Sequence, residues 1–232
     1  MRTPLSRGAW VECDPAWIGS AEADALLSGL LDELRWEQRE IVVYGRRIMQ
    51  PRLIAWAGEL AYRYSGLILE PRPFTPLAAR LLTDIRARAR VPFNHVLANR
   101  YRHGDDTMGF HADAEPELGR DPVVASVSFG VARRLVLKPR RSANGARHVF
   151  DLGAGSLFIM GGTCQRHYVH GIPRQPNVDA ERISLTFRWL LRNPSRSDCD
   201  DRARSQEPST VTGDPASRPH SARATVQLKL TL

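Results

Sequence analysis

The 232-residue chain has little cysteine, almost no lysine and no long apolar run. Its three cysteines, Cys13, Cys164 and Cys199, are scattered without zinc-type spacing, which argues against a disulfide framework and a cysteine metal centre. No apolar run reaches the length that spans a bilayer, and the first residues lack the apolar core of a secretion signal. We therefore expect a cytoplasmic protein with no membrane partner.

The charge of the chain is strongly positive. The net charge is +8 and the pI about 10.1, and arginine supplies nearly all of it, since the lysines are Lys138 and Lys229. Codon bias in a GC-rich genome explains an excess of arginine over lysine equally well. The basicity itself still favours a polyanionic partner such as nucleic acid, without proving one.

Hydrophobic periodicity separates a helical first part from a strand-rich second part. Apolar residues at helical spacing predict helices over 21–34, with Ser20 as N-cap, and over 77–90. Short β-type runs predict strands over 93–101, 123–130, 134–138, 148–152, 155–160 and 183–191. Such strands, separated by Gly and Pro, are typical of a sandwich or double-stranded β-helix. We therefore predict an α+β fold, a jelly-roll core with N-terminal helices buttressing one sheet.

Composition suggests four segments along the chain. Residues 1–35 form an N-terminal extension and helix, and residues 36–92 form hairpins and a supporting helix. Residues 93–192 carry the β core. Residues 193–232 are rich in Ser, Pro, Asp, Arg and Gly and poor in large apolar residues, so we expect this tail to be disordered.

A possible metal site begins at His111-Ala112-Asp113. Residues two apart on an extended segment project to the same face, so His111 and Asp113 can bind one ion. With His170 from another strand they would form the two-histidine, one-carboxylate triad of non-haem Fe(II) oxygenases. Taken alone, a His-x-Asp pair is more often an ordinary surface or core histidine. Three other histidines compete for the remaining position: His103, His148 and His167.

The segment from Arg182 to Arg188 alternates strictly between polar and apolar residues. Its polar residues share one face of a strand, while Ile183, Leu185 and Phe187 pack on the other. The polar face is either a solvated surface or the lining of a barrel. A barrel lined by two guanidinium groups requires an anion, because a buried unpaired charge is very costly. A dicarboxylate meets this requirement, since guanidinium pairs bidentately with carboxylate.

Five motifs in this order carry a family resemblance. They are Asn99-Arg100-Tyr101, His111-x-Asp113, Ser126-Val127-Ser128-Phe129-Gly130, His167-Tyr168-Val169-His170-Gly171-Ile172-Pro173 and Arg182-x-x-x-Thr186-Phe187-Arg188. Together they resemble the AlkB family of Fe(II)- and 2-oxoglutarate-dependent nucleic-acid dealkylases. The resemblance runs from about residue 42 to residue 191 and is strongest to the branch that repairs duplex DNA. It identifies residues 36–92 as nucleotide-recognition hairpins and residues 93–192 as a dioxygenase core.

The resemblance implies roles for the motif residues. His111, Asp113 and His170 would hold Fe(II), where O2 also reacts, and so form the catalytic centre. Arg188 would pair with the distal carboxylate of 2-oxoglutarate, and Arg182 would lie near its iron-chelating end. Three further side chains would contact this cosubstrate: Asn99, Tyr101 and Thr186.

A hairpin is expected to contact the nucleic acid, because a dealkylase must flip its base out of the stack. By resemblance, Tyr44 would be the wedge that fills the vacated position. Arg46, Arg47 and Arg52 would contact phosphates, which position a protein without reading sequence. The alternative is that Tyr44 is half-buried in an ordinary hairpin.

Three residues are expected at the base itself. By resemblance, Tyr64 would stack on the flipped base and Tyr62 would be a polar contact. Without the resemblance, both rings would be assigned to the core. Glu115 could accept a hydrogen bond from the exocyclic amine of a methylated adenine or cytosine, and its charge would favour a cationic lesion. Asp105 and Asp106, in the loop before the triad, are expected to be solvated.

The leading interpretation is direct reversal of N-alkylated DNA such as 1-methyladenine and 3-methylcytosine, with release of formaldehyde. The alternatives are an RNA dealkylase, a 2-oxoglutarate dioxygenase acting on a protein or small molecule, and a catalytically inert DNA-binding relative. The intact ligand set argues against an inert protein. Duplex DNA is the expected partner, single-stranded DNA and RNA stay open, and a monomer is expected.

Overall fold

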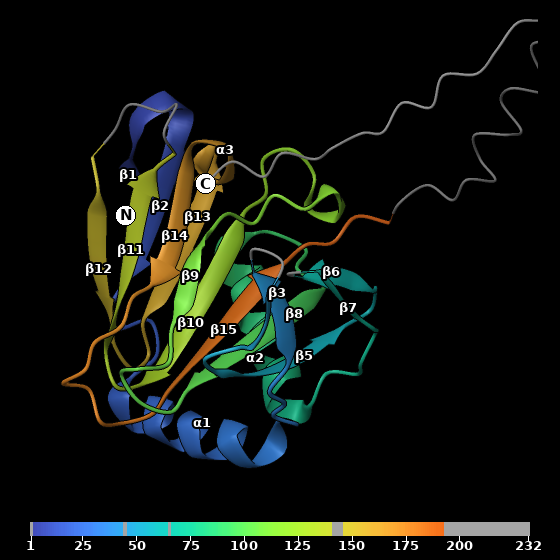
Figure 1. Cartoon of the computed structure of the whole chain (residues 1–232), viewed down its shortest axis with the longest axis vertical. Coiled ribbons are helices and arrows are strands. Elements are labelled where there is room, and N and C mark those ends of the chain that lie inside the picture. Colours follow the sequence, from blue (N-terminus) through green and yellow to red (C-terminus); the bar gives the residue numbers. More distant parts are fainter. Residues whose placement is uncertain (1, 44–45, 65, 141–145, 193–232) are drawn as a thin grey trace, which may run out of the picture. The chain divides into compact units, whose positions relative to one another are not determined.

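Two antiparallel sheets enclose the core of the protein (Figure 1). The structure is a computed structural model and describes residues 2–43, 46–64, 66–140 and 146–192. The larger sheet consists, in spatial order, of β1 (Arg2–Pro4), β2 (Ala9–Asp14), β13 (Leu157–Gly162), β10 (Val124–Gly130), β15 (Arg182–Arg188), β8 (His95–Tyr101) and β5 (Leu53–Gly58). The smaller sheet consists of β12 (His148–Leu152), β11 (Arg133–Pro139), β14 (Tyr168–Ile172) and β9 (Met108–His111). This arrangement confirms the predicted jelly-roll class.

Two hairpins lie outside these sheets. The first pairs β3 (Glu40–Val43) with β4 (Arg46–Met49), and the second pairs β6 (Tyr62–Tyr64) with β7 (Leu67–Leu69). The predicted wedge residue, Tyr44, lies outside the described residues, between β3 and β4. The tail at 193–232, predicted to be disordered, also lies outside them.

Helices α1 (Ser20–Glu33) and α2 (Pro76–Ala89) cover the outer face of the larger sheet (Figure 1). Their apolar stripes, which include Leu30 and Ile85, pack on the outward-facing Ile183, Leu185 and Phe187 of β15. This confirms the predicted buttress and the predicted apolar face of β15. Helix α1 starts one residue before the expected position, because Gly19 rather than Ser20 is the N-cap.

The N-terminal extension is part of the larger sheet, which the sequence did not indicate. Strand β2 pairs with β13 from Ala9↔Gly162 to Asp14↔Leu157, and β1 adds the edge strand. Three short elements complete the part of the chain that the structure describes: the 3-10 turns Ser6–Gly8 and Pro116–Leu118, and helix α3 (Cys164–His167). Among the described residues, no helix has the length and apolarity needed to cross a membrane.

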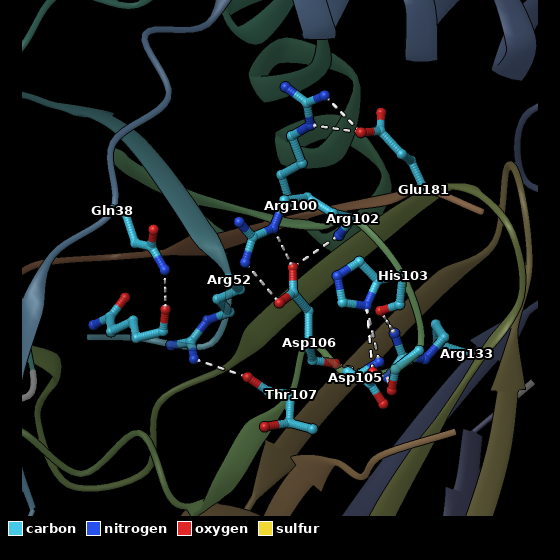
Figure 2. Close-up of polar contacts among 12 residues, drawn as sticks. Gln38, Arg52, Arg100, Arg102, His103, Asp105, Asp106, Thr107, Arg133 and Glu181 are labelled. Atoms are coloured by element: carbon cyan, nitrogen blue, oxygen red, sulfur yellow. Dashed lines mark hydrogen bonds and ion pairs between the residues drawn. The ribbon is translucent and has the colours of Figure 1, made fainter. Parts of the chain in front are cut away.

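The loop at residues 102–107 joins β8 to β9 and is held by ion pairs and backbone contacts (Figure 2). Asp106 is 3% exposed and accepts hydrogen bonds from the Arg102 guanidinium at 2.8 and 2.9 Å. The prediction that Asp106 is solvated was therefore wrong, whereas Asp105 is exposed and pairs with Arg174. The loop matters for function because β9 ends at His111.

Arg133 at the start of β11 ties this loop to the segment after β14. Its side chain is fully buried, and its guanidinium donates to the backbone oxygens of His103, Asp106 and Pro173 at 2.8–3.0 Å. Burial lowers the pKa of Arg133, although the nearby Tyr101 acts to raise it. Because all these acceptors are backbone carbonyls, loss of the guanidinium would leave several buried carbonyls unsatisfied.

We predict that Arg133→Met destabilises the protein by about 3–5 kcal/mol, since methionine fills the volume but donates no hydrogen bond. Urea unfolding measures this loss as a lower midpoint at unchanged slope. The control is Arg134→Met at the adjacent, exposed position, which should change the free energy of unfolding by less than about 0.5 kcal/mol. Equal stability of the two variants would contradict the assigned role of Arg133.

Candidate metal and cosubstrate site

Strands β9 and β14 bring the three candidate metal ligands together. His111 and His170 are directly paired in the register of these strands, and Asp113 follows β9 by two residues. One ligand atom from each of His111, Asp113 and His170 lies within 4.8 Å of the others. His167, the competing candidate, ends helix α3 and is not part of this group.

Both histidines are set up to bind a metal as neutral imidazoles. Nδ1 of His111 lies 2.9 Å from the carbonyl oxygen of Gly109, which can only accept, so Nδ1 carries the proton and Nε2 offers its lone pair. Burial lowers the pKa of His170 to about 3, with a further contribution from His111, and burial also lowers the pKa of His111. Neither imidazole needs to lose a proton before it binds a metal at neutral pH.

Asp113 is held as a carboxylate by a neighbouring cation. Burial would raise its pKa, but Arg188, His170 and His111 together lower the pKa to about 2. Nε and Nη2 of Arg188 donate to Asp113 Oδ1 at 3.0 and 2.7 Å. The other oxygen, Oδ2, lies 3.7 Å from His170 Nε2. The backbone N–H of Asp113 donates to Gln165 Oε1 at 3.0 Å, which fixes the loop itself.

The donor set fits ferrous iron. Nε2 of His111 and Oδ2 of Asp113 are buried and have no hydrogen-bond partner among the described residues. Two imidazoles and one carboxylate on one side of an ion leave positions for other ligands, as in non-haem iron oxygenases, whereas structural zinc sites are closed. His111, Asp113 and His170 would therefore hold the metal, with Arg188 compensating the charge of the carboxylate.

A cavity lined by His111 and His170 extends between the two sheets. Polar residues from the inner faces of β8, β10 and β15 line much of it: Asn99, Tyr101, Ser126, Arg182, Ser184, Thr186 and Arg188. The polar face of β15 therefore lines a barrel and is not a solvated surface, which resolves the alternative left by the sequence.

Arg182 is the cation of this cavity that lacks a negative partner. It is 1% exposed, and only Nη2 has a partner among the described residues, the hydroxyl of Ser128 at 2.9 Å. Nε and Nη1 are buried and unpaired there, and burial lowers the pKa of this guanidinium. Each of these nitrogens leaves an N–H group that an anionic oxygen in the cavity can accept.

The structure places Arg188 differently from the sequence-based expectation. Arg188 contacts the metal ligand Asp113, so it lies at the metal end of the cavity and not at the distal end. Arg182 stands six residues away along β15, and its two unpaired nitrogens make it the candidate for the distal carboxylate of a dicarboxylate. The sequence predicted a shared face but not which of its two cations lies nearer the metal.

The residues expected at the base are mostly buried. Tyr62 and Tyr64 are 0% and 4% exposed, and their ring centroids are 6.2 Å apart. Glu115 is partly buried, and burial, followed by the charge of Asp113, raises the pKa of its carboxyl group. The structure thus places Tyr62 and Glu115 in one electrostatic cluster with Asp113 and Arg188.

Arg52 does not lie where a phosphate contact would lie. It is 4% exposed, and its guanidinium donates to Asn99, Thr107 and Tyr64. A side chain buried in this way cannot reach the backbone of a nucleic acid, so this part of the predicted phosphate surface was wrong. Arg47 is exposed on β4 beside Glu40, and the side chain of Arg46 lies outside the described residues.

Two polar residues of the site had no role assigned from the sequence, although Ser128 belongs to one of the quoted motifs. Gln165 holds the backbone of Asp113 from helix α3, and nothing in the sequence pattern connects these two positions. Ser128 is the partner of Arg182. A signal for Ser128 did exist, because Ser126 and Ser128 alternate on β10 and therefore share the inward face.

The ligands and the cavity fit an iron oxygenase with a dicarboxylate cosubstrate. A model of the 2OG-Fe(II) oxygenase superfamily matches residues 11–188. The human alpha-ketoglutarate-dependent dioxygenase alkB homolog 3 is 36% identical over 188 residues, which is 78% of this chain and 66% of that protein. The mouse DNA oxidative demethylase ALKBH2 is 34% identical over 199 residues, 80% of this chain and 82% of that protein.

The chain belongs to the AlkB family within the 2OG-Fe(II) oxygenase superfamily. It spans slightly less than two thirds of the length of the alkB homolog 3 proteins that it matches. The structure of OsALKBH1 shares the fold, with a TM-score of 0.53 at 15% identity over 81% of this chain and 99% of that one.

We predict that Arg182→Met weakens 2-oxoglutarate binding by at least about 100-fold, because a buried guanidinium–carboxylate pair is lost. Titration calorimetry with Mn(II) in place of Fe(II) measures this affinity without turnover. Arg188→Met should instead weaken Mn(II) binding, since Asp113 loses the cation that keeps it ionised. The reverse outcome, with 2-oxoglutarate binding lost in Arg188→Met and kept in Arg182→Met, would contradict this arrangement.

Proposed function

We propose that the protein is an oxidative demethylase of N-alkylated bases in DNA, such as 1-methyladenine and 3-methylcytosine. The observation that carries the proposal is the group of His111, Asp113 and His170 at a cavity that contains the unpaired Arg182. The similarity to proteins named as a DNA oxidative demethylase and an alkB homolog supports nucleic acid as the substrate.

The chemistry of the proposed reaction balances with the expected cosubstrates. Bound Fe(II) would supply the oxidation in which O2 places one oxygen atom in the N-methyl group and one in succinate, with loss of carbon dioxide from 2-oxoglutarate. The resulting N-hydroxymethyl group breaks its C–N bond and leaves as formaldehyde, which restores the base.

The residues of the chain contribute binding, orientation and charge. Arg182 would hold the distal carboxylate, so that the other end of 2-oxoglutarate faces the metal ligands. Arg188 keeps Asp113 ionised while it is buried. Glu115 follows Asp113 by two residues. Its carboxylate would accept a hydrogen bond from the exocyclic amine of adenine or cytosine.

The proposal favours duplex DNA because of the β3–β4 hairpin. Ile48 and Met49 on β4 are 42% and 50% exposed, which gives this hairpin an apolar surface suited to bases. Tyr44 would be its wedge. We further propose that the protein acts as a cytoplasmic monomer, as expected from the sequence. RNA is the second candidate substrate, since the contacts named here do not involve the sugar.

We predict that the protein, with Fe(II), 2-oxoglutarate and ascorbate, releases formaldehyde from an oligonucleotide that contains 1-methyladenine. His111→Ala and Asp113→Ala should each reduce this release by at least about a thousandfold, because metal chemistry carries the step. His103→Ala, at an exposed histidine outside the ligand group, is the matched control and should keep activity. Sustained turnover by His111→Ala would contradict the assignment of His111 as a metal ligand.

Comparing duplex DNA, single-stranded DNA and RNA in this assay tests the preferred substrate. We predict that duplex DNA is processed at a rate comparable to or higher than single-stranded DNA. Replacing Tyr44 by Ala should reduce activity on the duplex by about tenfold more than on the single strand, since unstacking costs a few kcal/mol. Equal losses on both substrates would refute the wedge, and a preference for RNA would favour the second candidate.

A further inference from the structure

Arg52 lies between the cosubstrate cavity and the tyrosine expected at the base. Nε donates to Asn99 Oδ1 at 2.7 Å, Nη1 to the backbone oxygen of Thr107 at 3.0 Å, and Nη2 to the hydroxyl of Tyr64 at 2.6 Å. These acceptors belong to three separate parts of the chain. Among the described residues, no carboxylate accepts a hydrogen bond from Arg52, so each bond leads to a neutral group of the site.

The contact with Asn99 fixes which way its amide group is turned. A guanidinium has donors and no acceptor, so the amide must present its oxygen to Arg52. Nδ2, the donor end of the same amide, is then left for the cavity that Asn99 lines. An amide donor is the group that a carboxylate or keto oxygen of 2-oxoglutarate requires. Arg52 therefore sets Asn99 to bind an anion without touching that anion itself.

The other two contacts reach the substrate side and the metal strand. Tyr64 uses its hydroxyl as acceptor for Arg52, which fixes the plane and depth of its ring. The backbone of the Pro51-Arg52 segment is also bonded to Thr107, because the Thr107 N–H donates to the Pro51 oxygen at 3.0 Å. Thr107, which accepts a hydrogen bond from Arg52 (Figure 2), directly precedes β9, the strand that carries His111. A shift of Arg52 would therefore displace its contacts with Asn99, Tyr64 and Thr107.

We propose that Arg52 is a positioning residue that couples cosubstrate binding to base binding. When 2-oxoglutarate engages Asn99, the Arg52 guanidinium is held in place and with it the ring of Tyr64. When a base stacks on Tyr64, the same contact stabilises Asn99 in its binding orientation. Such coupling is reciprocal: each ligand must raise the affinity for the other by the same factor. This inference rests on the proposed function, because it names the base as the second ligand.

The test measures two affinities in the Mn(II)-loaded protein, which binds without turnover. The first is the Kd of 2-oxoglutarate with and without a saturating oligonucleotide that contains 1-methyladenine. The second is the Kd of that oligonucleotide, by fluorescence anisotropy, with and without saturating 2-oxoglutarate. We expect each ligand to lower the Kd of the other by the same factor, about 5- to 20-fold.

Three variants separate coupling from simple structural damage. Arg52→Lys keeps the charge but carries its donors on one nitrogen, which cannot span the three acceptors. Binding of 2-oxoglutarate should therefore weaken about tenfold, and the coupling factor should fall to about one. Tyr64→Phe keeps the ring and removes the hydroxyl. This variant should change the Kd of 2-oxoglutarate by less than about twofold, and its coupling factor should still fall to about one. Arg100→Lys, on the same strand as Asn99 but paired with Glu181, should change neither quantity.

The outcomes distinguish this inference from the proposed function. If the wild-type protein binds no methylated oligonucleotide, the proposed function fails. If it binds the oligonucleotide but shows a coupling factor of one, or if Tyr64→Phe retains the wild-type factor, the role of Arg52 is refuted. Because Tyr64→Phe tests the coupling by itself, the inference is still decided if Arg52→Lys does not fold.

Discussion

The buried contact between Asp113 and Arg188 is the interaction on which the site depends. It joins the loop after β9 in the smaller sheet to β15 in the larger sheet, across the space that holds the cavity. One carboxylate oxygen of Asp113 accepts hydrogen bonds from the Arg188 guanidinium, and the other faces His170. A single carboxylate therefore closes the barrel on one side and offers a metal ligand on the other.

The interior of this barrel carries more positive than negative charge. Arg52, Arg182 and Arg188 are all at most 4% exposed, and Asp113 compensates one of them directly. Arg52 satisfies its donors with neutral acceptors, whereas Arg182 keeps two buried N–H groups unpaired within the described part of the chain. A buried, under-compensated guanidinium is costly, and a dicarboxylate removes that cost when it binds. The structure is thus set up for an anionic cosubstrate.

Much of this arrangement could be predicted from sequence because it follows from short-range geometry. The spacing of His111 and Asp113 and the alternation of β15 each determine a shared face through the period of a strand. The order of Arg182 and Arg188 relative to the metal could not be predicted in this way. It depends on how β15 is placed against the loop after β9, which is a tertiary contact between segments 75 residues apart in sequence.

The same limit explains the misplacement of Arg52. The family resemblance placed it among the phosphate contacts of the hairpin, and local pattern gives no sign that two of its acceptors lie 47 and 55 residues further along the chain. The N-terminal strands were missed for a related reason, since β2 is completed by its pairing with β13 near the end of the core. Burial of a charged residue is decided by its partners, and partners distant in sequence leave no local pattern.

A structure of the protein crystallised with Mn(II) and 2-oxoglutarate, with the metal located by anomalous scattering, tests the central claim most directly. The account predicts Mn(II) bound by His111, Asp113 and His170, with the distal carboxylate of 2-oxoglutarate paired with Arg182. A metal bound elsewhere, or a distal carboxylate paired with Arg188, would contradict it.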